Sequence, residues 1–314
     1  MARKISDYII IGLKGMGMGA ADVIPGVSGG TIAFISGIYQ ELIDSIKSVD
    51  KQFLSLLLRF KIAEAWKHIN GTFLLCVLGG ILISVFSLAK VLTFLLEHHT
   101  MLVYAFFFGL IIGSSYFVGR TIKKINIGSI IFFIAGTSVA YWITIASPAT
   151  TPDQYWFIFL SGAIAICAMI LPGISGSFIL LLMGKYEFIL NAVKEFKIGI
   201  LALFAGGCLF GILGFSHVIS WLFKKHPNFT VALLTGFMVG SLNKLWPWKQ
   251  VLETGFNSHG EVIPIVEKSI LPGTYTQITG QPNQLGLVLA CIFAGLVIIF
   301  IFEFIGDRVA RKKN

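Results

Sequence analysis

Two stretches decide the fold: Asp22-Val23-Ile24-Pro25-Gly26-Val27-Ser28-Gly29-Gly30-Thr31 and, further along, Met169-Ile170-Leu171-Pro172-Gly173-Ile174-Ser175-Gly176-Ser177-Phe178. Each interrupts an apolar run with Pro-Gly, and glycines and hydroxyl-bearing residues follow. In a bilayer, a broken helix leaves backbone N–H and C=O groups that need partners. Two such breaks in related sequences indicate that the freed groups are used.

The composition is that of a polytopic membrane protein. Of the 314 residues, 56% are apolar and 12% are charged, and the mean hydropathy is +0.85. Several runs reach the ~20 apolar residues that a spanning helix needs. The net charge of +9 comes from basic residues in short loops beside apolar runs, where such residues set orientation, so we expect no nucleic-acid partner. The four cysteines lie in apolar segments without disulfide or metal spacing, and we expect neither metal nor cofactor.

The first half, residues 1–150, predicts a re-entrant helical hairpin followed by three membrane spans. The hairpin covers 8–46, because each arm would be roughly 22 Å long as a helix, too short to cross a bilayer. A basic stretch at 47–71 predicts an amphipathic helix on the membrane surface. The spans are expected at 73–96, 101–118 and 128–146.

The second half, residues 151–314, predicts the same plan. Its hairpin is expected at 155–193, and its spans at 199–223, 229–248 and 285–305. The polar stretch at 249–284 is expected to be an exposed loop.

An internal repeat relates the two halves. A shift of 147 residues aligns the motifs and Tyr39 with Tyr186, and a shift of 127 aligns Gly80 with Gly207 and His99 with His226. The difference of 20 residues matches the basic insert at 47–71. An odd number of crossings in each half predicts that the second half is inverted relative to the first.

The distribution of basic residues agrees with this inverted arrangement. With both termini in the cytoplasm, 16 of the 24 Lys and Arg residues lie inside, as the positive-inside rule requires. The predicted fold is therefore an all-α polytopic membrane protein with inverted-topology repeats. This architecture is typical of secondary transporters, whose binding sites form where broken helices meet.

The motifs predict a phosphate site. A helix start after Pro-Gly offers free N–H groups and a partial positive charge, which suit an anion. We expect the site to combine motif glycines and hydroxyls with nearby lysines: Gly26, Ser28, Gly29, Gly30, Thr31, Gly173, Ser175, Gly176, Ser177, Lys14, Lys90 and Lys185. Ionisable groups at membrane depth mark functional sites, and Lys14 and Asp22 lie in or beside the first hairpin. Partial protonation would make it easier to move a phosphate through the bilayer, so Asp22 and the acids at the hairpin exits, Glu41 and Glu187, are the candidates for proton coupling.

Each of these predictions has a structural alternative. Pro-Gly-x-Ser-Gly also kinks helices or packs them tightly. Lys14 and Asp22 would then close the hairpin locally, and Lys90 would extend to the interface. Glu41, Lys185 and Glu187 would be solvated helix ends.

At the paired motifs and at Gly184-Lys185-Tyr186-Glu187, the sequence resembles the domain-of-unknown-function 368 family, identified as bacterial polyprenyl-phosphate transporters. The resemblance covers nearly the whole chain. It implies a flippase in the bacterial cytoplasmic membrane that returns undecaprenyl phosphate, the carrier lipid of cell-wall synthesis, from the outer to the cytoplasmic leaflet. Coupling to a proton or another ion is compatible with this function. The resemblance implies nothing about the oligomeric state.

Two other functions remain open. An undecaprenyl-diphosphate phosphatase-like hydrolase also has inverted repeats and Pro-Gly-x-Ser elements, but Gly29 and Gly176 occupy the position of its arginine, and no Glu precedes Pro25 or Pro172. A small-anion channel or exchanger would use the same helix starts without a lateral opening for a lipid tail.

Overall fold

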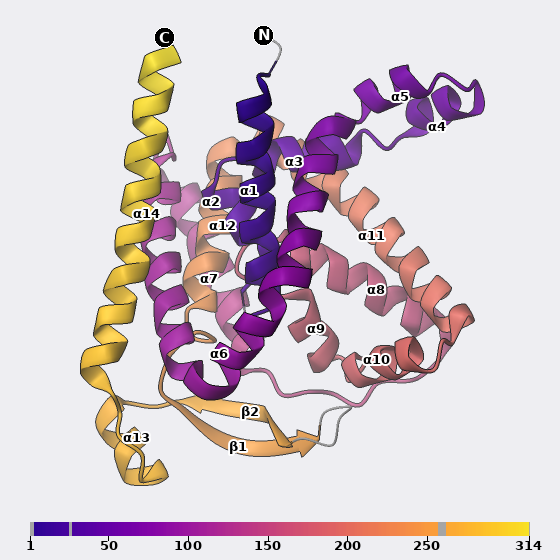
Figure 1. Cartoon of the computed structure of the whole chain (residues 1–314). Helices are drawn as coiled ribbons and strands as arrows, with labels where there is room; N and C mark the ends of the chain where they lie inside the picture. Colours follow the sequence, from indigo (N-terminus) through magenta and orange to yellow (C-terminus); the bar gives the residue numbers. More distant parts are fainter. Residues whose placement is uncertain (1–2, 25–26, 257–261, 314) are drawn as a thin grey trace. The chain divides into compact units, whose positions relative to one another are not determined.

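The computed structural model describes residues 3–24, 27–256 and 262–313. They are mostly helical, and Figure 1 follows the elements along the chain from indigo to yellow. The backbone contacts divide the chain into two compact units. Unit 1 contains residues 1–93 and 148–230, and unit 2 contains residues 94–147 and 231–314.

Unit 1 contains both motifs. Its first half consists of α1 (Ile5–Asp22), α2 (Gly29–Ile35), α3 (Tyr39–Lys47), α4 (Lys51–Leu58), α5 (Ile62–His68) and the beginning of α6 (Gly71–Arg120). Its second half consists of α8 (Tyr155–Ile170), α9 (Gly176–Leu182), α10 (Tyr186–Lys194) and α11 (Ile198–Lys225). Helix α11 packs on α8 and α3, and α2 packs on α1 and α8.

Unit 2 contains the rest of α6, α7 (Ile127–Ile145), most of α12 (Pro227–Ser241), α13 (Pro272–Thr279) and α14 (Leu285–Lys313). It also contains an antiparallel pair of strands, β1 (Lys249–Phe256) and β2 (Val262–Ser269), with an irregularity in the register around Glu253. The side chains of Ala105, Trp248 and Val288 form a buried cluster. Through these residues, the start of the β-hairpin packs against α6 and α14.

Within the described residues, four helices are long and apolar enough to cross a membrane. They are Gly71–Leu88 and Phe94–Arg120, both in α6, together with α7 and α11. The pair α9 and α10 also qualifies, with a bend of 107° that fits either a broken span or a re-entrant loop. The chain is therefore a multi-pass membrane protein.

Glycines set the closest contacts between helices in unit 1. A Cβ on Gly80 would lie 2.1 Å from the carbonyl oxygen of Gly12, and a Cβ on Gly207 would lie 2.0 Å from that of Phe159. Shifts of 127 and 147 residues convert the first contact into the second. The contact between Gly15 and Val77 and the contact between Gly162 and Phe204 are related in the same way.

Unit 2 has its own matching glycine contacts. A Cβ on Gly109 of α6 would lie 2.0 Å from the carbonyl oxygen of Ile292 in α14. A Cβ on Gly236 of α12 would lie 2.3 Å from that of Phe133 in α7. In unit 2, α6 therefore packs closely against α14, and α12 packs closely against α7.

Several predicted elements differ from the structure. The stretch at 249–284, predicted to be a loop, contains a β-hairpin followed by α13, and Val262, Ile263 and Val266 are strand-forming residues. The mostly helical fold therefore also contains one pair of strands. The surface helix at 47–71 is two short helices, separated where Phe60 adopts a φ of +55°. The span at 229–248 ends at Ser241, where the chain tightens into successive turns before Pro247.

The predicted break between the first two spans is a kink inside α6. His99 has φ −137° and ψ 34°, and its repeat partner His226 ends α11 with φ −134° and ψ 56°. Both histidines thus leave helical geometry at matching positions of the repeat.

Candidate functional site

The first motif satisfies its own helix start. The amide of Gly29 donates to Oδ1 of Asp22 at 2.6 Å, and the amide of Gly30 donates to Oγ of Ser28 at 3.0 Å. The amide of Thr31 donates to the carbonyl of Ser28 at 2.9 Å. The first three N–H groups of α2 therefore already have partners, and one of these partners is a carboxylate.

Two hydrogen bonds join the motifs to each other. The hydroxyl of Ser28 donates to the carbonyl of Met169 at 2.8 Å, and the amide of Gly173 donates to Oγ1 of Thr31, also at 2.8 Å. Ser28, Thr31 and Gly173 are all buried. The two breaks, far apart in the sequence, thus support each other within unit 1.

The motif glycines allow close approach. A Cβ on Gly29 would lie 2.5 Å from the carboxylate of Asp22, and a Cβ on Gly30 would lie 2.5 Å from the carbonyl oxygen of Ile170. A Cβ on Gly176 would lie 2.7 Å from the carbonyl oxygen of Ala165. Tight packing therefore accounts for part of the motif, as the structural alternative predicts. Gly26 lies outside the described residues.

The hydroxyls of the second motif lie close together. Oγ of Ser175 and Oγ of Ser177 are 2.8 Å apart. The hydroxyl of Ser28 in the first motif instead donates to the Met169 carbonyl. Gly173 has φ +89°, a left-handed conformation that suits glycine.

Two of the lysines predicted to contact the phosphate donate hydrogen bonds to oxygens elsewhere in unit 1. Lys14 Nζ donates to the carbonyl of Ser36 at 2.6 Å, which ties α1 to the end of α2. Lys185, with 1% of its surface exposed, donates to the carbonyl of Thr151 at 2.8 Å and to Oδ1 of Asp153 at 2.5 Å. The side chain of Lys90 lies outside the described residues. A phosphate contact by these lysines remains a prediction.

The three candidate acids have different surroundings. Only Asp22 takes part in the hydrogen bonds of the motifs given above. Glu41 accepts two hydrogen bonds of 2.6 Å from Arg3 and one of 2.7 Å from Asn70. Glu187 is exposed in the first turn of α10. Of the three acids, Asp22 is therefore the one whose protonation would directly change a hydrogen bond of the motifs.

Comparison with known proteins agrees with the resemblance seen in the sequence. The model of the undecaprenyl phosphate translocase-like family matches residues 18–263. The chain belongs to this family. The match includes both motifs and extends into the β-hairpin.

Two curated relatives support the family membership. A polyprenyl-phosphate transporter of Vibrio cholerae is 45% identical over 303 residues, which cover 96% of this chain and 98% of the relative. A polyprenyl-phosphate transporter of Staphylococcus aureus is 35% identical over 258 residues, which cover 75% of this chain and 85% of the relative. No solved structure matches the chain.

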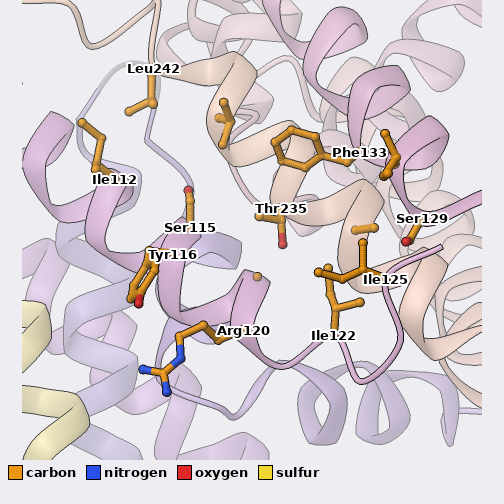
Figure 2. A pocket seen from close by; sticks show the side chains of 14 residues that line it. Ile112, Ser115, Tyr116, Arg120, Ile122, Ile125, Ser129, Phe133, Thr235 and Leu242 are labelled. Atoms are coloured by element: carbon orange, nitrogen blue, oxygen red, sulfur yellow. The ribbon is translucent and has the colours of Figure 1, made fainter. Parts of the chain in front are cut away.

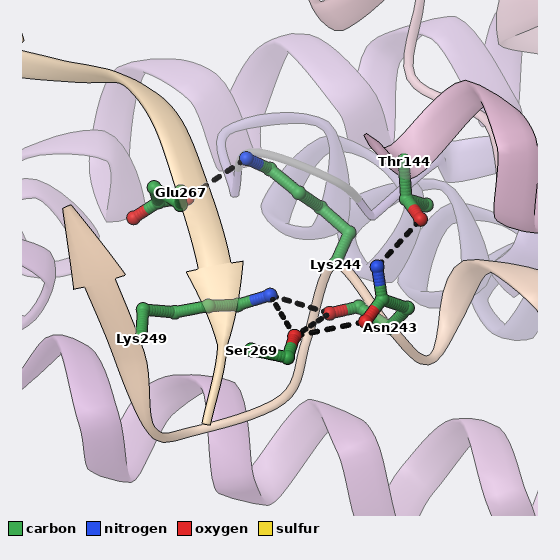
Figure 3. Close-up of polar contacts among 6 residues, drawn as sticks. All are labelled: Thr144, Asn243, Lys244, Lys249, Glu267 and Ser269. Atoms are coloured by element: carbon green, nitrogen blue, oxygen red, sulfur yellow. Dashed lines mark hydrogen bonds and ion pairs between the residues drawn. The ribbon is translucent and has the colours of Figure 1, made fainter. Parts of the chain in front are cut away.

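A second polar cluster, which the sequence patterns did not predict, lies in unit 2 (Figure 3). Nζ of Lys249 donates to the carbonyl of Asn243 at 2.5 Å and to Oγ of Ser269 at 2.8 Å. Ser269 donates to Oδ1 of Asn243 at 2.8 Å, and Lys244 pairs with Glu267 at 2.9 Å. Burial, followed by the nearby Lys244, lowers the pKa of Lys249 to about 8, whereas Glu267 acts in the opposite direction.

A signal for this cluster was present in the sequence. Lys244 and Lys249 flank Trp246 and Trp248, and an apolar run rich in β-branched residues begins at Val262. Pairing of β1 with β2 brings Ser269 opposite Lys249 and completes the cluster.

Unit 2 also contains two cavities that the sequence could not reveal. The larger, about 590 Å³, lies among α6, α7 and α12, and Figure 2 shows Arg120, Phe133 and Thr235 in its wall. The smaller, about 520 Å³, is lined by residues of the same helices together with Asn243, Trp246 and Ser269.

Proposed function

We propose that this protein is a flippase that carries polyprenyl phosphate, such as undecaprenyl phosphate, across the bacterial cytoplasmic membrane to its inner leaflet. Its membership of the undecaprenyl phosphate translocase-like family carries the proposal. The returned lipid would then be available for another round of cell-wall synthesis.

An inverted-repeat architecture fits this function. We propose that each half contributes a hairpin and three spans, with both termini in the cytoplasm. The recurrence of the Gly80–Gly12 contact as Gly207–Phe159 supports the repeat. The excess of basic residues in the predicted cytoplasmic loops supports the orientation.

The two motifs form the proposed head-group site. The hydrogen bond from Gly29 N–H to Asp22 supports this assignment, because a carboxylate oxygen accepts it from a backbone amide at a helix start. A phosphate oxygen has the same charge and hydrogen-bonding character. In the transport cycle, the phosphate takes the place of the carboxylate, and the hydroxyls of Ser28, Thr31, Ser175 and Ser177 provide further contacts.

Protonation of Asp22 offers a coupling step. A neutral carboxyl group accepts a weaker hydrogen bond than a carboxylate does. Uptake of a proton by Asp22 therefore releases the Gly29 amide for the phosphate, and loss of the proton favours return of the carboxylate. Binding of proton and lipid would in this way be linked.

A leaflet assay tests the function directly. Proteoliposomes with the full chain receive a labelled polyprenyl phosphate in one leaflet, and a membrane-impermeant reagent reports the label that remains accessible. We expect exchange at least tenfold faster than in protein-free vesicles, and no exchange of the corresponding polyprenol. Movement of inorganic phosphate without movement of the lipid would instead favour an anion channel.

A further inference from the structure

The two cavities of unit 2 share part of their walls, and together they are called the groove below. The two cavities share Val239 of α12 and Leu242, the residue that follows α12, and residues of α6 and α7 also line both. On α7 the lining runs from Ser129 to Tyr141. At 1.5 Å per helical residue, this stretch is about 18 Å long, more than half the thickness of a bilayer core.

The middle of the groove is apolar. Its wall includes Ile112, Phe133, Val239 and Leu242. The hydroxyls between them bond to their own helices: Ser115 donates to Ile111 at 2.7 Å, Thr137 to Phe133 at 2.9 Å and Thr235 to Val231 at 2.8 Å. The surface offered to an occupant in this part is therefore mainly hydrocarbon.

Cationic groups lie at both ends. Arg120 lines one end, where its guanidinium lies 5.7 Å from the centre of the Tyr116 ring. Asn243 and Ser269 line the other end, and Lys249 donates a hydrogen bond to each of them.

The charges at the Lys249 end favour an anion. The carboxylate of Glu267 pairs with Lys244, and the pair is largely buried, with 14% of the Lys244 side chain and 13% of the Glu267 side chain exposed. The hydrogen bonds of Lys249 described above go to uncharged oxygens. This cluster of two ammonium groups and one carboxylate therefore has a net positive charge, which favours binding of an anion.

We propose that this groove holds the isoprenoid chain of a polyprenyl phosphate, with the phosphate at Asn243, Ser269 and Lys249. The inference rests on the proposed function and deepens it by assigning a second lipid site outside the motifs. An apolar channel with a few polar groups at its end is the usual form of a site for an amphiphile. The charge at the end selects an anionic head group, and the single channel fits one unbranched run of isoprene units.

Photolabelling of the wild-type chain tests the location. A polyprenyl phosphate with a diazirine in its tail is added to the full chain in lipid nanodiscs, and mass spectrometry locates the adducts. We expect adducts on α7 and α12 around Phe133 and Val239, with at least fivefold less labelling by the matching polyprenol. Adducts confined to other helices, or equal labelling by the polyprenol, would overturn the assignment.

Competition distinguishes the possible sources of phosphate. An excess of unlabelled polyprenyl phosphate is expected to remove the adducts, whereas inorganic phosphate at the same concentration leaves them in place. Equal competition by inorganic phosphate would mean that the cluster binds a free anion and that the tail contributes nothing. That result would overturn the lipid site.

Matched variants test the two parts of the groove. Val239→Phe fills the groove at a residue common to both cavities, and Val139→Phe makes the same change at an α7 position that is 48% exposed and outside both linings. Lys249→Gln removes the cation, and Lys268→Gln makes the same change at an exposed position on β2. We expect the first member of each pair to lower labelling at least fivefold and the second to leave it unchanged; equal effects within a pair would contradict the proposal.

The leaflet assay separates this inference from the proposed function. If the wild-type protein flips the lipid but the groove is not labelled, the proposed function stands and the lipid site in the groove is contradicted. If the wild-type protein flips no lipid, the proposed function itself is contradicted.

Discussion

Thr31 and Gly173 are 142 residues apart in sequence, yet the amide of Gly173 donates a hydrogen bond of 2.8 Å to Oγ1 of Thr31. Thr31 belongs to the first motif and Gly173 to the second. The side chain of one broken helix therefore satisfies the backbone of the other.

Replacement of Thr31 by valine is expected to destabilise unit 1. Valine has nearly the same shape but no acceptor, so the buried N–H of Gly173 would lose its partner. Such a loss costs about 1–3 kcal/mol. Thermal unfolding in detergent should show a lower melting temperature for Thr31→Val, whereas Thr31→Ser, which keeps the hydroxyl, should remain closer to the wild type. Equal melting of Thr31→Val and the wild type would show that this bond contributes little.

Replacement of Asp22 by asparagine is expected to stop transport without unfolding the protein. The amide oxygen of asparagine can still accept the hydrogen bond from Gly29, but the side chain can no longer gain or lose a proton. The leaflet assay should fall to the level of protein-free vesicles, while the melting temperature stays within a few degrees of the wild type. Normal transport by Asp22→Asn would remove Asp22 from the coupling step and leave Glu41 and Glu187 as candidates.

Alanine substitutions at neighbouring glycines should have opposite outcomes. At Gly80 the new Cβ would lie 2.1 Å from the Gly12 carbonyl oxygen, whereas at Gly79 it would meet no atom within 4 Å. Gly80→Ala must push α6 away from α1 and is expected to cost about 1–3 kcal/mol, as overpacking typically does. Gly79→Ala should be neutral or slightly stabilising, because alanine is the better helix former.

The second half provides an independent copy of this test. Gly207→Ala would meet the Phe159 carbonyl oxygen at 2.0 Å, whereas Gly206→Ala would lie 3.7 Å from the Phe159 ring. Melting temperatures should again separate the two variants. If Gly207→Ala were as stable as Gly206→Ala, close packing would not explain the repeated glycines.

The stability of unit 2 is expected to rise with pH between about 8 and 10.5. Burial and the neighbouring Lys244 lower the pKa of Lys249 to about 8, against the opposite effect of Glu267. In this interval the unfolded chain still binds a proton at Lys249 and the folded chain does not, so stability increases as pH rises. The wild type should gain stability relative to Lys249→Met between pH 8 and 10, measured as the difference between their melting temperatures. A constant difference across this range would show that the Lys249 cation is well accommodated in the fold.

Local patterns predicted much of unit 1. The apolar runs and the Pro-Gly breaks located the helices on either side of each motif, because a backbone break leaves a clear signal in an apolar sequence. The repeat offsets also predicted equivalent positions: His99 and His226 both leave helical geometry, and Gly80 and Gly207 make the same contact. The partners of the motif groups were harder to predict. That Ser28 reaches Met169, and Thr31 reaches Gly173, depends on tertiary packing.

The polar cluster and the groove of unit 2 depend on long-range structure. Lys249 and Ser269 become neighbours only when β1 pairs with β2, and the hydrophobic pattern alone suggested a loop. The wall of the groove comes from three helices, so no local window of sequence contains it. A sequence can place a charge near the end of a span, but the partner of that charge is set by the fold.

The contact between Gly109 and Ile292 also has a consequence for biosynthesis. Gly109 lies in α6, and its close partner Ile292 lies in α14, the last helix of the chain. While the ribosome is still translating the intervening residues, Gly109 on α6 lies in the membrane or in the insertion machinery without its partner Ile292. Unit 2 can therefore complete its packing only after α14 has been synthesised.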